Sequence, residues 1–366
     1  MTGRIVKIGF IIVPLFWFFV SMNSLNGGYL LPRQGQFVAM MCVAIAALSW
    51  ISGNKWFRAF GLYVVAWIVF ANVYALCFPD TRFVIGAVDS RDFARHFLVA
   101  LAIYVSVTRA DVETETWFNA ICLGAVVQSI IAIPQYFGYY PDDLLIGWTG
   151  IKTDHSARLV VGTMENSNFF SAYLAISLPF FLRRNWAYLL PVLVVHLILA
   201  RTTTAWAAAI VGMCVFVDRR WMWTAGAALV ALYVFLKSAW IMDNDRFQLW
   251  EQAIRNYNWN WFGIPFGQGP FAFWGQPYPL HNDWLQHFYE FGLVGMSIVA
   301  GYVITVYRKN RILFAAFVAV CVNMIGNFPT QLPPTAFLIV IILALIEKER
   351  SQGDRIQHNT TGRVRL

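Results

Sequence analysis

Charged residues are scarce in this chain. Asp, Glu, Lys and Arg make up 13% of its 366 residues, whereas hydrophobic residues make up 59%. Soluble domains carry about 25% charged residues, which they need to cover a surface that faces water. The scarcity therefore excludes an ordinary water-soluble enzyme and predicts a protein whose surroundings are largely lipid.

Several common binding and catalytic motifs are also absent. The sequence contains no G-x-S-x-G, no H-E-x-x-H and no G-x-x-x-x-G-K, so neither a nucleophile elbow nor an ATP-binding loop is expected. Its five cysteines show no C-x-x-C spacing, which makes a disulfide framework or a zinc knuckle an unsuitable interpretation. No Arg-rich face interleaved with aromatics suggests a nucleic-acid partner.

Long apolar runs, by contrast, recur along the whole chain. A helix needs about 20 apolar residues to cross a bilayer core. The runs that meet this length are 5–25, 59–78, 117–137 and 221–240. The shorter runs are 37–52, 93–108, 169–182, 186–200, 205–217, 288–307, 312–326 and 336–346. Hydropathy thus predicts an all-α polytopic membrane protein with roughly twelve transmembrane helices, which have membrane lipids as their surroundings.

The distribution of basic residues predicts the orientation of these helices. With the N-terminus inside, most of the 27 Lys and Arg residues fall in cytoplasmic segments, such as the short connections 183–185, 218–220 and 308–311. Such an excess is typical of cytoplasmic loops. Both termini are therefore expected in the cytoplasm. The first run is expected to be an uncleaved anchor, because no A-x-A-like site follows it.

The sequence predicts a single integral membrane domain, 1–346, followed by a polar cytoplasmic tail, 347–366, which we expect to be disordered. Two long outer loops, 138–168 and 241–283, are rich in Trp, Tyr, Gly, Pro and charge. The second loop lies between the ninth and tenth predicted spans. Loops of this length in a compact protein are usually functional, so the chemistry is expected on the outer side.

A histidine stands at the end of the second loop. Asp283 and Gln286 predict a capping box, in which Asp283 is the N-cap of the following helix and Gln286 reaches back. A cap does not account for His281, whose imidazole can take and return protons near neutral pH. His287 lies six residues further on, which is not the spacing of a helical zinc pair.

Three arginines are candidates for binding an anionic substrate. Arg201 is an isolated charge at a tight outer turn between two spans, and its alternative role is a snorkelling interfacial arginine. Arg246 begins an amphipathic stretch, where it could instead pair with Glu251 or Asp243. Arg158 precedes a segment rich in Asn and Gly. Guanidinium groups bind phosphate oxygens bidentately, so several outer arginines around one histidine favour a phosphate-bearing substrate.

Other polar features have simpler interpretations. Asp243 and Asp245 have the D-x-D form that often binds a divalent metal, but we interpret them as a polar loop entering a helix and predict no metal site. His196 lies within an apolar run and is expected to hydrogen-bond a neighbouring helix. Trp259 and Trp261 could stack on sugar rings, although an interfacial aromatic belt explains them as well.

Five stretches carry polar positions in a fixed order. They are RLVVGTMENSNFFSAYLAISLP (158–179), ARTTTAWAAAIVG (200–212), DRFQLWEQAI with GIPFGQGPF (245–271), HNDWLQHFYEFGLVG (281–295) and NFPTQLPPTAFLIVIIL (327–343). Together they resemble the bacterial O-antigen ligase and polymerase superfamily. The chain departs from that pattern at Ser167, where proline is common, and at Thr202 and Thr203, where small residues are usual. These departures leave the subtype open.

The resemblance implies a C-type glycosyltransferase fold in the bacterial inner membrane, with the active site facing the periplasm and no metal or cofactor. The donor would be a glycan on undecaprenyl pyrophosphate. By the same resemblance, His281 would act as the base or orient the acceptor hydroxyl, and Arg201 and Arg246 would bind the pyrophosphate. Arg158 is a lesser candidate for that role.

The expected reaction is ligation of O-antigen to lipid A–core, with inversion at the anomeric carbon. An O-antigen polymerase uses the same class of donor with a lipid-linked acceptor, and a protein O-oligosaccharyltransferase is a third variant. A transporter or flippase is the alternative from a different class. Transporters place ionisable groups near the membrane midplane, whereas the matched polar groups here fall in outer loops and at outer helix ends.

Overall fold

The computed structural model describes residues 112–139, 167–216, 244–268, 282–306, 310–329 and 333–362, with gaps at 258, 262, 328 and 330–332, and a few single residues between 59 and 164. Every regular element in these ranges is a helix and none is a strand. The predicted all-α class is therefore confirmed for the described part of the chain.

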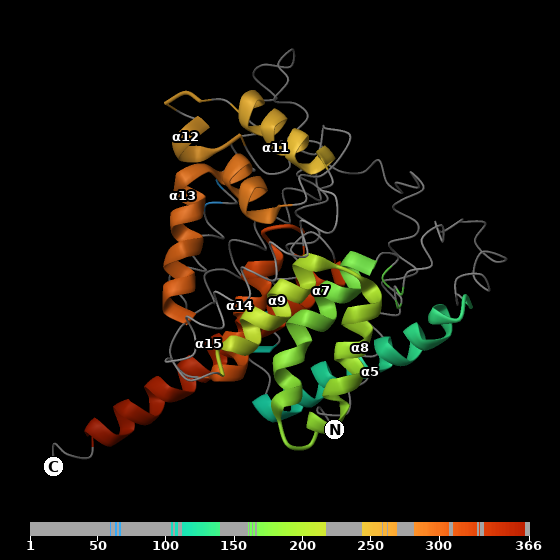
Figure 1. The fold of residues 1–366 in the computed structure, drawn as a ribbon. Helices are drawn as coiled ribbons and strands as arrows, with labels where there is room; N and C mark the ends of the chain where they lie inside the picture. Colours follow the sequence, from blue (N-terminus) through green and yellow to red (C-terminus); the bar gives the residue numbers. More distant parts are fainter. Residues whose placement is uncertain are drawn as a thin grey trace, which may run out of the picture. The chain divides into compact units, whose positions relative to one another are not determined.

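The chain divides into two compact units. Figure 1 labels their helices. The first unit contains α5 (Thr114–Tyr136), α7 (Ser167–Ser177), η1 (Leu178–Leu182), η2 (Ala187–Leu189), α8 (Leu190–Ala200), α9 (Thr203–Cys214), α14 (Arg311–Asn323) and the start of α15 (Pro333–Gly362). The second unit contains α11 (Asn244–Asn256), α12 (Gly263–Phe266), α13 (Asp283–Val306) and the remainder of α15.

Most of the described helices coincide with predicted apolar runs, whereas α11 and α12 lie within the predicted outer loop 241–283. Run 117–137 covers most of α5, and run 169–182 forms most of α7 with η1. Among the described helices, α5 is long and apolar enough to cross a membrane, whereas Ser167–Leu182, Ala187–Ala200, Thr203–Cys214 and Arg311–Asn323 are shorter apolar helices. Runs 5–25, 37–52 and 221–240 lie outside the described residues. The roughly twelve spans stay a prediction.

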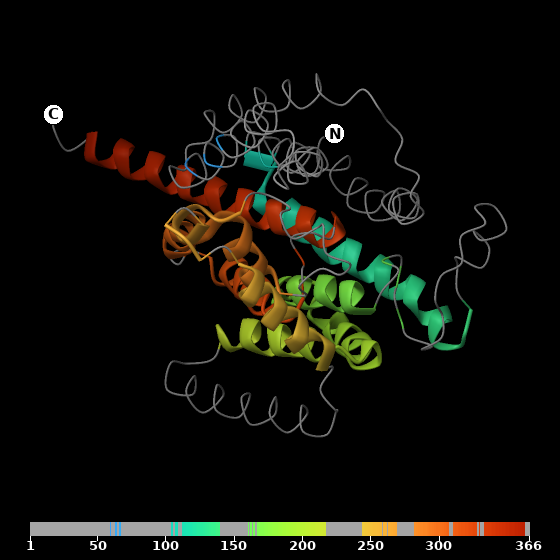
Figure 2. The ribbon, with the colours of Figure 1, turned by 90° about the horizontal axis from the view of Figure 1, so that it is seen from above.

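Small residues allow α9 and α14 of the first unit to pack closely. Ala205 and Ala208 on α9 are fully buried, as are Ala315 and Ala319 on α14. A Cβ atom added to Gly212 would lie 2.9 Å from the Ala315 carbonyl oxygen. Such close backbone approach through Gly and Ala is typical of helix pairs in membranes. Figure 2 shows the helices of the first unit from above.

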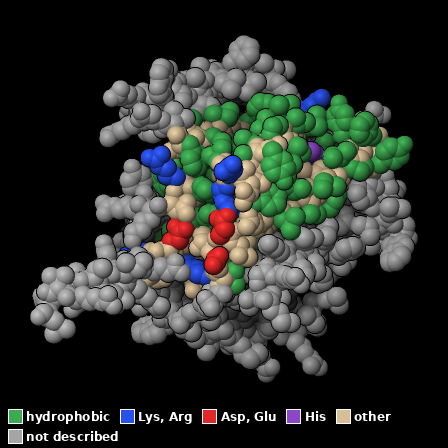
Figure 3. Space-filling model, turned by 90° about the horizontal axis from the view of Figure 1, so that it is seen from below, with side chains coloured by type: hydrophobic (Ala, Val, Ile, Leu, Met, Phe, Trp, Pro, Cys, Tyr) green, Lys and Arg blue, Asp and Glu red, His purple; other side chains and the backbone are tan. Residues whose placement is uncertain are grey.

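Large apolar side chains are exposed on the first unit. On α8 they include Val194, Val195 and Ile198, with 41%, 50% and 48% exposure. Figure 3 shows a broad hydrophobic area on one face of the molecule. Extended exposed apolar areas are typical of surfaces that contact a membrane or another protein.

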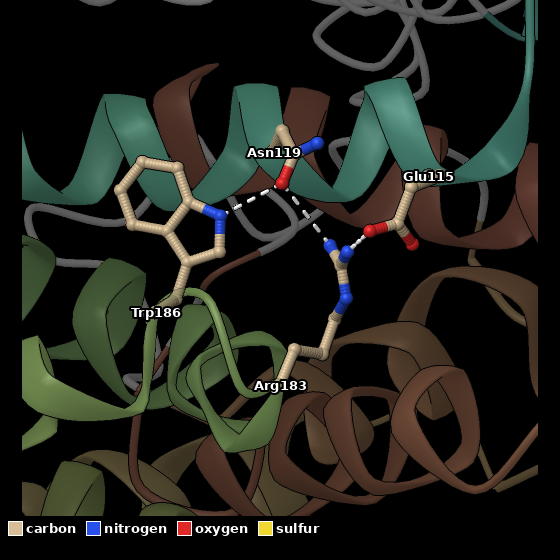
Figure 4. A network of polar contacts seen from close by, with 4 residues as sticks. All are labelled: Glu115, Asn119, Arg183 and Trp186. Carbon is tan, nitrogen blue, oxygen red and sulfur yellow. Dashed lines mark hydrogen bonds and ion pairs between the residues drawn. The ribbon is translucent and has the colours of Figure 1, made fainter.

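A polar network fastens the start of α5 to the turn before α8 (Figure 4). Arg183 forms an ion pair with Glu115 and donates a 3.3 Å hydrogen bond to Asn119 Oδ1. Trp186 donates to the same oxygen at 2.7 Å. The Arg183 side chain is 13% exposed, and this partial burial lowers the pKa of its guanidinium. The charge is thus satisfied inside the protein, so this connection serves structure.

Helix α13 of the second unit is broken at Gly292, where φ is 59° and ψ is −164°. A Cβ atom added there would lie 2.7 Å from the Pro265 carbonyl oxygen, so α13 and the segment around α12 meet backbone to backbone. The Tyr63 hydroxyl lies within hydrogen-bonding distance of the carbonyl oxygens of Phe266 (2.8 Å) and Phe291 (2.6 Å). One phenol therefore serves carbonyls on both sides of the contact.

The predicted disorder of the polar tail is wrong for most of its length, because α15 continues to Gly362. Glu347 and Lys348, at the start of the predicted tail, are only 8% and 7% exposed. Their burial means that packing extends beyond the apolar run 336–346. The helix therefore continues into sequence that hydropathy alone assigns to solvent.

Candidate functional site

Of the predicted site residues, Arg201 alone has a described side chain. His281 and Arg158 lie outside the described residues, and for Arg246 only the backbone, in α11, is described. Arg201 belongs to the first unit and Arg246 to the second. Arg201 and its surroundings are therefore the part of the predicted site with described side chains.

Arg201 occupies the two-residue connection between α8 and α9. Its φ of 53° and ψ of 32° lie in the left-handed region, and no other described residue except glycine has a positive φ. This conformation costs a non-glycine residue about 1–2 kcal/mol, and such strain clusters at functional sites when the surrounding structure enforces it. The predicted tight turn is confirmed, and its arginine side chain is exposed.

The carbonyl groups at the end of α8 find partners in the turn and at the start of α9. Trp206 Nε1 donates to the Leu197 carbonyl oxygen at 2.8 Å, and the Arg201 amide donates to the Ile198 carbonyl oxygen at 3.2 Å. Thr202 Oγ1 lies 3.1 Å from the Ala200 carbonyl oxygen. The final carbonyls of a helix lack intrahelical partners, so these bonds stabilise the abrupt reversal of the chain.

Thr202 also connects the turn to two distant segments. Its hydroxyl lies 3.2 Å from Asn168 Oδ1, at the start of α7. The Asn168 carbonyl oxygen accepts a 3.2 Å hydrogen bond from Asn327 Nδ2, just beyond α14. Thr202 and Asn327 are 6% and 2% exposed. We call Asn168, Thr202 and Asn327 the Asn168 network; it joins three segments that are far apart in sequence.

Two further contacts hold helix ends of the first unit. A Cβ atom on Gly326 would overlap the Thr204 side chain in the first turn of α9. Gln135, near the end of α5, donates to the Gly162 carbonyl oxygen at 2.6 Å and accepts from the Gly162 amide at 2.8 Å. The ends of α5, α9 and α14 are thus held by specific contacts near residues 162, 204 and 326.

The sequence did not single out the Asn168 network as part of a site. Asn168, Thr202 and Asn327 each stand at the border of an apolar run, at 169–182, 205–217 and 312–326. Following the predicted alternation of the helices, all three borders face the outer side. That coincidence is the signal that could have identified the network, because antiparallel helices bring such borders together.

The start of α13 differs from the predicted capping box. Asn282 Oδ1 accepts a 2.9 Å hydrogen bond from the Leu285 amide, so Asn282 is the N-cap. Asp283 is the first helical residue and is fully buried. Gln286 Nε2 donates forward to Glu290 Oε1 at 2.9 Å. The prediction was wrong by one residue because Asn caps a helix as well as Asp does, and Asp283 is drawn into the interior.

His196 also differs from the prediction of a bond to a neighbouring helix. Its Nδ1 lies 2.7 Å from the Val192 carbonyl oxygen on its own helix, and its ring contacts Phe170 edge-on at 6.2 Å between centroids. A short-range partner within α8 therefore satisfies this buried imidazole. Among the described residues, no group of three or more His, Cys, Asp and Glu could hold a metal ion.

An aromatic cluster surrounds the end of α11 in the second unit. Tyr257 stacks on Phe288 with 5.3 Å between centroids, and Trp259 packs edge-on against Tyr257 at 4.8 Å. Burial raises the pKa of the Tyr257 phenol, and Tyr289 raises it further. Trp259 is 55% exposed. The predicted amphipathic character of this stretch is confirmed, although Ala253 and not Ile254 faces the cluster.

Of the two partners suggested for Arg246, Asp243 lies outside the described residues and Glu251 pairs with another arginine. Glu251 forms a 2.5 Å ion pair with Arg255, one helical turn further along α11.

Comparison of the chain with protein-family models and with curated protein sequences finds no match. The resemblance to the ligase and polymerase superfamily rests on the quoted motifs.

Proposed function

We propose that this chain is an inverting, metal-independent glycosyltransferase of the bacterial inner membrane. It moves a glycan from undecaprenyl pyrophosphate to an acceptor hydroxyl on the periplasmic face, and the reaction that we infer is O-antigen ligation to lipid A–core. The observation that carries the proposal is the Asn168 network. There, three of the five stretches that resemble the family meet beside Arg201.

Arg201 suits a pyrophosphate leaving group. Within the described part of the chain, its side chain forms no ion pair or hydrogen bond, so its charge is available to an anion. A guanidinium stays protonated in an apolar setting and can bind two phosphate oxygens at once. Fixed positive charge stabilises a departing pyrophosphate most where water is partly excluded. Arg246 and Arg158 are proposed to share this role.

The proposed chemistry is a single displacement. The acceptor oxygen attacks the anomeric carbon while the bond from that carbon to the pyrophosphate oxygen breaks, and attack opposite the leaving group inverts the centre. His281 takes the proton of the acceptor hydroxyl. A well-placed base of this kind contributes about 10²–10⁴-fold to the rate. The donor is already activated, so no nucleotide is required.

The proposed surroundings are a bilayer crossed by roughly twelve helices, with both termini in the cytoplasm. The length and composition of α5 support this proposal, as do the small-residue contact between α9 and α14 and the exposed valines of α8. The exposed end of α11 with Trp259 fits a water-facing periplasmic loop.

One observation favours the alternative class, a transporter or flippase. Helix α13 is broken at Gly292, and its first half carries the buried side chains of Asp283, Gln286 and Glu290. Broken helices with buried polar groups form the substrate sites of many transporters. The same break serves a transferase if it fixes the helix start that follows His281.

A gene deletion examined by lipopolysaccharide gels and lipid-linked glycan analysis separates these functions. Loss of all O-antigen with accumulation of lipid-linked polymer on the periplasmic side supports the ligase. A single repeat on the core identifies a polymerase instead. Lipid-linked glycan that accumulates on the cytoplasmic side identifies a flippase. An unchanged surface glycan contradicts the proposal.

A further inference from the structure

We propose that Asn168, Thr202 and Asn327 are positioning residues that hold Arg201 for the pyrophosphate of a lipid-linked donor. The inference rests on the proposed function, since it assigns these residues a role at the same site. None of the three is proposed to contact the reacting atoms. They act through the backbone that carries the guanidinium.

The conformation of Arg201 requires support from its neighbours. A left-handed φ is unfavourable for arginine, so an isolated turn would relax toward another conformation and carry the side chain with it. Ala200 and Thr202, on either side of Arg201, are only 1% and 6% exposed. Arg201 is therefore an exposed side chain on a buried, constrained backbone.

The Thr202 hydroxyl is the central constraint. Its oxygen lies within hydrogen-bonding distance of two acceptors, the Ala200 carbonyl oxygen at 3.1 Å and Asn168 Oδ1 at 3.2 Å. The first contact closes the turn around Arg201, and the second ties the turn to α7. The Asn168 backbone is fixed in its own right, because its carbonyl oxygen accepts from Asn327 Nδ2 at 3.2 Å and from Ser171 Oγ at 3.1 Å.

The network contains no charged side chain, which distinguishes Arg201 from Arg183. Both arginines stand in turns between helices of the first unit: Arg183 follows η1, and Arg201 lies between α8 and α9. Arg183 is neutralised by Glu115 and bonded to Asn119, whereas the Arg201 side chain has neither kind of partner among the described residues. A turn that is fixed by neutral groups leaves the charge of Arg201 for an anionic ligand.

The experiment uses the full-length chain in lipid nanodiscs with undecaprenyl pyrophosphate as the probe. Thr202→Val keeps the shape of the side chain and removes its hydroxyl, and Thr202→Ser restores the hydroxyl. We expect Thr202→Val to weaken binding about three- to tenfold, the range for losing one hydrogen bond, and Thr202→Ser to bind as the wild type does. Arg183→Gln is the matched control, with lowered thermal stability and unchanged affinity.

A double-mutant cycle identifies the positioning role. If Thr202 acts through Arg201, the double variant Arg201→Gln/Thr202→Val binds no more weakly than Arg201→Gln alone. Additive losses, or wild-type affinity in Thr202→Val, overturn the positioning role while the proposed function stands. Wild-type affinity in Arg201→Gln removes the pyrophosphate role of Arg201 itself and the positioning role with it. Thermal unfolding of each variant shows that the folded chain is compared.

Should Thr202→Val fail to fold, Asn327→Ala tests the same proposal from the far end of the network. It removes the hydrogen bond to the Asn168 carbonyl oxygen and leaves Thr202 and Arg201 unchanged. We expect a smaller loss of affinity that vanishes in the Arg201→Gln background. A loss that is equally large in both backgrounds overturns the proposal.

Discussion

Replacement of Gly292 by alanine tests whether the break in α13 is held by backbone contact. Gly292 has φ 59° and ψ −164°, close to a region that only glycine occupies readily, and a side chain there costs about 1–3 kcal/mol. The new Cβ atom would also lie 2.7 Å from the Pro265 carbonyl oxygen. Overpacking of this kind costs a further 1–3 kcal/mol or so.

Gly138→Ala is the matched control for this prediction. Gly138 also has a positive φ, 87°, but a Cβ atom there would meet nothing within 4 Å. The control therefore carries the conformational cost without the overlap. We expect Gly138→Ala to lower the free energy of unfolding by about 1–3 kcal/mol, and Gly292→Ala to lower it by about 1–3 kcal/mol more than the control does.

The assay combines thermal unfolding of the full chain in nanodiscs with backbone hydrogen exchange. Exchange should rise in both 263–268 and 283–295 of Gly292→Ala, because the two segments meet at the break. In Gly138→Ala these segments should exchange as in the wild type. Equal destabilisation by the two variants, or unchanged exchange in 263–268, would refute the backbone contact.

Three further predictions concern stability, and each is checked by thermal unfolding of the full chain. Gly326→Ala should lower the free energy of unfolding by about 1–3 kcal/mol through overpacking. Adding Thr204→Ser should restore stability, because it removes the Thr204 methyl group that the new Cβ atom would overlap. A double variant that stays destabilised contradicts the contact. Asn310→Ala should cost about 0.5–2 kcal/mol, since Asn310 Oδ1 accepts from two amides of α14, whereas Asn310→Asp should cost little. Glu115→Gln should cost no more than about 1 kcal/mol because Glu115 is 52% exposed, so a larger loss would mean that the ion pair matters more than its exposure implies.

The sequence predicted the helices well where apolar runs end at polar residues. Run 169–182 became α7 with η1, and the reversal at Arg201 fell where an isolated charge separates two runs. Both follow from hydropathy and from the preference of polar residues for helix ends. The left-handed conformation of Arg201 could not be predicted, because local sequence favours it only for glycine and the Thr202–Asn168 contact beside it joins segments that are distant in sequence.

Contacts between distant segments explain the other differences. The break at Gly292 depends on Pro265 and Tyr63, and nothing in the local sequence of α13 specifies those neighbours. The cap at Asn282 instead of Asp283 followed from the burial of Asp283. Local sequence offered two equally good caps, and packing selected between them.

The proposed transferase activity is tested most directly by glycan transfer with the purified full-length chain. Lipid-linked glycan donor and lipid A–core acceptor are supplied in bilayers, and the glycosylated acceptor and the released undecaprenyl pyrophosphate are measured together. We predict equal amounts of both products with the wild type, and transfer at least about 10²-fold slower with His281→Ala at the same level of folded protein. Transfer by His281→Ala at the wild-type rate would contradict the catalytic role of the histidine, and no product from the wild type would contradict the proposed function.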